Sequence, residues 1–191
     1  FLEASKNKEI QVISHFDTDG ITSAVIMTRA LKRLDKKFSL KIVKNLDEET
    51  IQTLSKNKMV LFLDLASGSF HHISKHNLKD VFIIDHHEII QKIPKEIEII
   101  NPQLHEKQKI SSSSLVYLFC KFLDEKNKDM AKFAVLGMVG DMLEKEIDKL
   151  NSHILEEGEI KRKRGLLIYP STRPLNRVLE YSSNPFIPGV T

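Results

Sequence analysis

The stretch IQVISHFDTDG, residues 10–20, joins a short apolar run to a group of polar side chains. Ile10 to Ser14 has the composition of a β-strand, and apolar residues recur at helical spacing from Ile21 to Leu34. Between these two segments lie His15, Asp17 and Asp19. The stretch therefore predicts a strand followed directly by a helix, with polar groups at the connection.

The same alternation continues through the first hundred residues. Further strands are predicted at 40–43, 59–63, 81–84 and 97–100, with helices at 47–55 and 70–76 between them. The runs at 59–63 and 81–84 are apolar without interruption, which is typical of parallel strands covered on both faces. We therefore expect an α/β fold with a mainly parallel five-stranded sheet flanked by helices.

The pattern changes after Asn101-Pro102. Four serines, Ser111 to Ser114, precede an apolar stretch, and serine is a favourable residue at the start of a helix. Helical spacing returns at 129–142 and 147–156. A helical C-terminal part should therefore follow the sheet.

The last segment differs from the rest in charge. Residues 161–191 carry six basic side chains and one acid, so the net charge of +3 divides into +5 here and −2 before it. Four prolines from Pro170 onward argue against a central strand or a long helix. We expect one domain at 1–160 and a basic arm at 161–191, with 166–169 and 186–187 docked on the domain surface. The cluster at 161–164 suits a polyanion, although a solvated linker would have the same charge.

The cysteine content and the lack of a long apolar run indicate the class of protein. Cys120 stands in a helical pattern between Phe119 and Phe122, which predicts a core residue rather than a nucleophile. A single cysteine excludes an internal disulfide and is in keeping with a reducing cytoplasm. No apolar run approaches the roughly 18 residues that span a membrane, so we expect no membrane association.

Acidic and histidine side chains follow three of the predicted strands. His15, Asp17 and Asp19 follow the first, Asp64 follows the third, and Asp85-His86-His87 follow the fourth. Because the carboxyl ends of parallel strands meet at one edge of a sheet, these groups should lie together.

Such a set predicts a site for two divalent ions. Oxygen and imidazole ligands without a thiolate suit Mn²⁺ or Mg²⁺ better than zinc. Several carboxylates in one pocket repel one another unless cations lie between them. Two ions would remove that repulsion, generate a hydroxide nucleophile and hold a phosphate for in-line attack. Gly20 is expected to allow a tight turn beside the ions and to open the next helix.

Each of these residues also has a purely structural interpretation. Asp17 to Gly20 could form an ordinary turn or part of a calcium loop, Asp64 could cap a helix, and Asp141 could be an exposed helix residue. His86-His87 could be a surface pair, as we expect for His71-His72. The combination at three strand ends favours a metal site over these separate interpretations.

The segments His15–Gly20 and Asp85–His87 resemble motifs of the DHH phosphoesterase superfamily. That superfamily includes RecJ exonucleases, short-oligonucleotide phosphodiesterases and family II inorganic pyrophosphatases. Asp64 with Gly68 behind it, and Gly137 to Asp141, resemble the two remaining motifs, so the resemblance covers about residues 10–145.

Two segments are most similar to archaeal RecJ-like nucleases, including those associated with the GINS replication complex. They are Ser14–Ile21 and the tail with Pro170–Leu175 and Pro185–Gly189. Bacterial RecJ proteins usually have Asp at the position of His15, whereas pyrophosphatases of the superfamily use a histidine ligand there.

The resemblance implies two ions, Mn²⁺ or Mg²⁺, and hydrolysis of single-stranded DNA or RNA in replication and repair, with a GINS-type complex as a partner. The implied metal ligands are His15, Asp17, Asp19, Asp64, His86 and Asp141. Asp64 would bridge the ions, His87 would face the scissile phosphate, and Asp85 would hold a histidine by a hydrogen bond.

Two other functions are compatible with the same residues. One is a phosphodiesterase for short oligonucleotides or cyclic dinucleotides. The other is a structural subunit of a replication complex, although no ligand position is visibly lost here. Members of the superfamily normally carry a second domain, DHHA1 or DHHA2. Since nothing in residues 145–191 resembles it, we expect that domain beyond Thr191.

Overall fold

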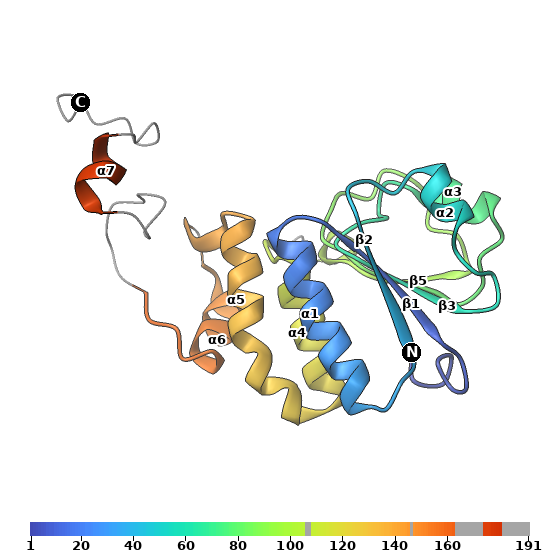
Figure 1. Cartoon of the computed structure of the whole chain (residues 1–191), viewed down its shortest axis with the longest axis horizontal. Coiled ribbons are helices and arrows are strands. Elements are labelled where there is room, and N and C mark those ends of the chain that lie inside the picture. Colours follow the sequence, from blue (N-terminus) through green and yellow to red (C-terminus); the bar gives the residue numbers. More distant parts are fainter. Residues whose placement is uncertain (106–107, 146, 163–173, 181–191) are drawn as a thin grey trace. The chain divides into compact units, whose positions relative to one another are not determined.

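The structure is a computed structural model that describes residues 1–105, 108–145, 147–162 and 174–180. Residues 1–160 form one compact unit built around a five-stranded sheet of order β2-β1-β3-β4-β5. All pairings in this sheet are parallel, so the predicted α/β fold is confirmed (Figure 1). The strands are β1 (Ile10–His15), β2 (Phe38–Val43), β3 (Met59–Leu63), β4 (Val81–Ile84) and β5 (Ile97–Ile100).

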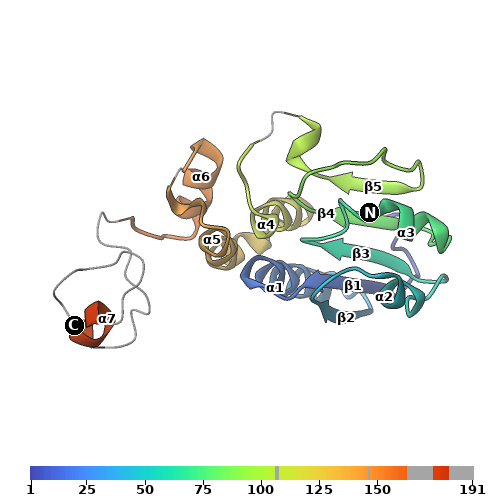
Figure 2. The ribbon, with the colours of Figure 1, turned by 90° about the horizontal axis from the view of Figure 1, so that it is seen from above.

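Helices cover both faces of the sheet. α1 (Thr18–Arg33) and α4 (Ser112–Leu123) lie on one face, and α2 (Glu48–Gln52) and α3 (Phe70–Lys75) lie on the other (Figure 2). α5 (Ala131–Gly140) packs on α1 and α4, and α6 (Lys149–Glu157) packs on α5, which confirms the helical C-terminal part. Short 3-10 helices lie at Pro102–Leu104, Glu125–Met130 and Leu143–Lys145. The predicted helix at 129–142 is thus shortened at both ends.

Alternate side chains of the central strands enter two separate cores. In β3, Leu61 and Leu63 pack beneath the layer of α1 and α4, whereas Val60 and Phe62 pack on the opposite face. Cys120 of α4 belongs to the first core, and burial raises the pKa of its thiol to about 12. It is therefore a core residue, as predicted.

The strand register aligns the residues that follow the strands. Ser14, Leu63, Ile84 and Ile100 are paired neighbours across β1, β3, β4 and β5. The next residue of each strand is consequently level with its neighbours, and these residues are His15, Asp64, Asp85 and Asn101. The chain runs outward from β1 to β2 and then returns to β3. Open α/β sheets bind ligands at such a reversal of strand order.

Gly20 does not form the predicted tight turn. α1 begins at Thr18, because the Asp17 carboxylate caps the helix by accepting a hydrogen bond of 2.9 Å from Gly20 N. Gly20 therefore lies inside the first helical turn. A Cβ at this position would lie 2.4 Å from the His15 carbonyl oxygen, so glycine is required here for the close approach of α1 to the end of β1.

Residues 161–191 form the second compact unit. Its described part contains α7 (Leu175–Glu180), and Lys161 and Arg162 are exposed. The apolar segments expected to dock, 166–169 and 186–187, lie outside the described residues, as do Lys163 and Arg164. The separation into a catalytic domain and a basic arm stays a prediction. No helix in the described ranges combines the length and the hydropathy of a membrane span.

Candidate metal centre

Histidine and aspartate side chains gather at the carboxyl edge of the sheet in three overlapping groups. Each group could hold a metal ion, because one ligand atom from each member lies within 4.8 Å of the others. The groups are His15, Asp17 and Asp64; Asp64, His86 and His87; and Asp19, His86 and Asp141. The structure thus brings together all six residues that the sequence predicted as ligands.

Asp64 lies between two of these groups. Its Oδ2 is 3.4 Å from His15 Nδ1, which is itself 2.8 Å from Asp17 Oδ2. Its Oδ1 is 3.6 Å from His86 Nε2, which is 3.4 Å from Asp141 Oδ2. The two oxygens of one carboxylate therefore face two different sets of ligand atoms.

The Asp64 carboxylate accepts no hydrogen bond from the described residues. The residue is 1% exposed, and its backbone φ of 59° lies in the left-handed region. Burial, together with the charges of Asp19 and Asp17, raises its pKa to about 10. A buried carboxylate without a donor is costly, and a bound cation would remove that cost. This residue is not a helix cap, since α3 begins after Ser69.

Asp141 occupies an unfavourable position for an acid. It follows the last turn of α5, where the helix dipole disfavours negative charge. Burial and the charges of Asp19 and Asp17 raise its pKa to about 7. Its Oδ2 is buried and has no hydrogen-bond partner among the residues that the structure describes, so Asp141 is not the exposed helix residue considered above.

Asp19 is held by the start of α4. Its Oδ2 accepts a hydrogen bond of 2.6 Å from Ser112 N, and its Oδ1 accepts one of 2.9 Å from Ser113 N. A helix N-terminus favours a carboxylate at this place. Ser111 is the N-cap residue, as the serine run predicted. The sequence shows where the helix starts, but it does not show that its first backbone N–H groups donate hydrogen bonds to Asp19.

Asp85 is buried and fully hydrogen-bonded. It accepts bonds from Ser67 N at 3.0 Å and His86 N at 2.8 Å, and its Oδ1 lies 2.7 Å from His87 Nδ1. Burial alone would raise the pKa of Asp85, but the hydrogen bonds from His87 and Ser67 lower it to about 2. The same contact raises the pKa of His87, whereas burial lowers that of His86. His86 and His87 are therefore not an ordinary surface pair, unlike His71 and His72 on α3.

Sequence comparison identifies the family of this chain. The family described as "DHH family, N-terminal domain" matches residues 9–140, which include the whole sheet. The chain belongs to the DHH family.

Relatives and solved structures agree with this assignment. An uncharacterized protein of Methanocaldococcus jannaschii is 30% identical over 196 residues, which cover 95% of this chain and 45% of that protein. The DHH domain described here thus spans less than half the length of this curated relative. Exonuclease RecJ bound to manganese has a TM-score of 0.69 at 20% identity, with 82% of this chain and 45% of RecJ covered.

CDC45 from Entamoeba histolytica has the same fold. Its TM-score is 0.60 at 21% identity, with 81% of this chain and 34% of CDC45 covered. At such identities the likeness to RecJ and CDC45 shows a shared fold. The DHH fold is therefore common to a nuclease and to CDC45.

Asn101 is a residue of this DHH domain that the sequence analysis did not single out. It is buried directly after β5, and its Nδ2 donates to His87 O at 2.9 Å and to Ser67 Oγ at 3.0 Å. Asn101 thus supports the same segment that Asp85 orients. Its position could have indicated this role, because Asn101 is the polar residue that directly follows the fifth strand.

Replacing Asp85 by Asn is expected to lower the pKa of His87. The amide can still accept the hydrogen bond from His87 Nδ1, but it lacks the negative charge that favours the protonated ring. NMR titration of the His87 ring in metal-free protein measures the effect, with the His71 signals as an internal reference. An unchanged His87 titration would show that Asp85 does not control this ring.

Proposed function

We propose that this chain is the DHH domain of a metal-dependent phosphodiesterase that acts as an exonuclease on single-stranded DNA or RNA. The observation that carries the proposal is the buried Asp64 carboxylate, which accepts no hydrogen bond within the described part of the chain and faces ligand atoms on both sides. Two divalent cations fit this arrangement, because each would neutralise carboxylates that otherwise repel one another.

The donor set favours Mn²⁺, with Mg²⁺ as the alternative. His15, Asp17 and Asp64 would hold one ion, and Asp19, His86 and Asp141 would hold the second. Asp64 also lies against His86 and would contribute to both. Carboxylate oxygens and imidazole nitrogens without thiolates suit these metals. The manganese-bound RecJ structure supports the same choice.

The residues around the ions would orient and stabilise a phosphate. When bound, the ions supply a hydroxide nucleophile and stabilise charge on the phosphate oxygens. His87 has a side chain that is 54% exposed and a ring oriented by Asp85 through Nδ1. Because its pKa is raised, the ring would stay protonated to higher pH and donate from Nε2 to a phosphate oxygen.

The likeness in fold to CDC45 leaves a structural role in a replication complex as the second candidate, with a GINS-type partner. Such a role does not require a converging set of six metal ligands, whereas the six are brought together here. The exposed Lys161 and Arg162 favour a long polyanion over a dinucleotide. A single-strand nuclease therefore agrees best with the residues present.

Mn²⁺ is expected to stabilise the protein and to switch on digestion of end-labelled single strands. A ligand at a hundred times its Kd stabilises the folded state by about 2.7 kcal/mol, which thermal unfolding detects. Cleavage should vanish in EDTA, and duplex of the same sequence is the control. A length series from dinucleotide to long strand separates the candidates: cleavage restricted to dinucleotides would favour the short-oligonucleotide activity. A protein that neither binds Mn²⁺ nor cleaves any strand would favour the structural role.

A further inference from the structure

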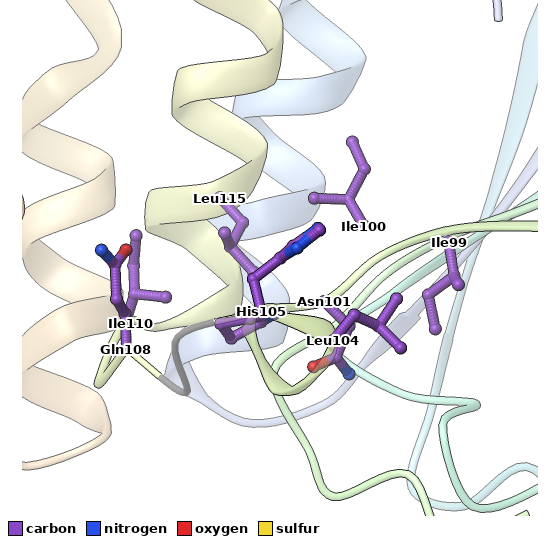
Figure 3. Close-up of a pocket in the computed structure, with 9 residues that line it drawn as sticks. Ile99, Ile100, Asn101, Leu104, His105, Gln108, Ile110 and Leu115 are labelled. Atoms are coloured by element: carbon purple, nitrogen blue, oxygen red, sulfur yellow. The ribbon is translucent and has the colours of Figure 1, made fainter.

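A pocket opens at the carboxyl end of the edge strand β5. It has a volume of about 490 Å³, within the range of sites for small ligands. We name it the β5 pocket, and its walls include Ile100, Asn101, Leu104, His105, Ile110 and Leu115. Figure 3 shows Ile99 and Ile100 from the strand on one side, and Ile110 and Leu115 from the start of α4 and the segment before it on another.

One wall residue of the β5 pocket also contacts the metal centre. Asn101 donates a hydrogen bond from its Nδ2 to the backbone oxygen of His87 at 2.9 Å. Ile110, another wall residue, lies two residues before Ser112, whose backbone N donates to Asp19 Oδ2. The pocket is therefore connected to the metal centre through Asn101 and through the segment that starts α4.

The chemistry of the described walls favours a largely apolar group that can stack on an aromatic ring. Isoleucine, leucine and proline side chains form most of the surface, and His105 adds an aromatic ring. Among the described residues, no carboxylate, lysine or arginine lines the pocket. Leu104 is 44% exposed at the rim, so the apolar surface is accessible from solvent. Bases of single-stranded nucleic acids stack on such apolar and imidazole surfaces.

We propose that the β5 pocket binds the base of a nucleotide next to the phosphate at the metal centre. The inference rests on the proposed function, because it takes the phosphate to lie between the ions and His87. The metals would then hold the backbone, and the pocket would add affinity for strands that carry a base at that position.

A comparison of base-bearing and abasic strands tests this inference. The probe is a short single strand with 2-aminopurine at one position, titrated with the full chain in Ca²⁺, and its partner has an abasic residue there. His105→Ala and Leu104→Ser are the variants, because both side chains are exposed and outside the core. Each should weaken binding of the 2-aminopurine strand about tenfold and reduce its quenching, in line with the contribution of one stacked base. Neither should change binding of the abasic strand.

Phe122→Ala is the matched control, because this side chain is 88% exposed near the other end of α4. Equal losses for both strands in His105→Ala and Leu104→Ser, or no loss for either, would overturn the inference. Digestion in Mn²⁺ is measured in parallel. If the wild type cleaves strands but the two variants show no selective loss of affinity for the base-bearing strand, only the base-binding role of the pocket is rejected. If the variants do show that selective loss but the wild type does not cleave, the base-binding role is supported and the nuclease activity is rejected.

Discussion

Replacing Asp64 by Asn is expected to abolish metal-dependent cleavage and, without metal, to raise the stability of the protein. Loss of one preorganised electrostatic group costs about 10²–10³-fold in rate, and Asp64 faces both ligand sets, so we expect at least about 10³-fold. In metal-free protein its pKa of about 10 means that folding at pH 7 requires uptake of a proton. That uptake costs up to about 4 kcal/mol, which the neutral amide avoids.

The stability difference between Asp64→Asn and the wild type should depend on pH. The pKa of Asp64 is about 10 in the folded, metal-free protein and about 4 in the unfolded chain. The wild type therefore becomes more stable as the pH falls from about 10 to about 4, because Asp64 takes up a proton more readily in the folded state. The advantage of Asp64→Asn should therefore be large at neutral pH and shrink in acid. Thermal unfolding in EDTA over a pH series measures it, and added Mn²⁺ should stabilise the wild type much more than the variant.

Asn is the appropriate substitution at this position. The backbone φ of 59° is tolerated by Asn, whereas Ala would add about 1–2 kcal/mol of strain and obscure the comparison. Cleavage near the wild-type rate would reject the bridging role of Asp64. Lower stability than the wild type in EDTA at neutral pH would show that its carboxylate is not an unpaired buried group.

Replacing Gly137 by Ala is expected to weaken both metal binding and folding. Ala normally stabilises a helix by about 1 kcal/mol relative to Gly. Here, however, a Cβ would lie 2.0 Å from Ser113 Oγ and 2.3 Å from Asp19 Oδ1, so α5 or Asp19 has to move. Overpacking of this kind lowers the free energy of unfolding by about 1–3 kcal/mol. Displacing a group that orients a metal ligand lowers the metal affinity about 10–100-fold.

Mn²⁺ titration and thermal unfolding in EDTA test Gly137→Ala. The control is Gly158→Ala at the end of α6, where an added Cβ has no neighbour nearer than 3.4 Å. That variant should bind Mn²⁺ like the wild type. If Gly137→Ala were more stable than the wild type with unchanged affinity, the close approach of α5 to Asp19 would have no functional importance.

The sequence predicted the sheet because its signals are local. The uninterrupted apolar runs of β3 and β4 are visible in the chain itself, and the acids after them follow from strand order. The apolar spacing predicts a helix from Ile21, but α1 begins at Thr18, because the Asp17 side chain caps it there.

The support of the centre was not predictable in the same way. Asp19 accepts hydrogen bonds from Ser112 and Ser113, more than 90 residues away in the chain. The left-handed backbone at Asp64 and the contact of Asn101 with His87 likewise depend on how strands meet. Such contacts follow from tertiary packing, for which the sequence has no local signal.

The ligands of the centre come from separate layers of the fold. His15 ends β1, and Asp64 and His86 follow β3 and β4. Asp19 lies on α1 against the start of α4, and Asp141 follows α5. Ions bound among them would join the sheet to the helical layer, so metal concentration and the rigidity of that layer would be thermodynamically linked. In a cell short of the metal, the same protein would lose activity and also become easier to unfold and to degrade.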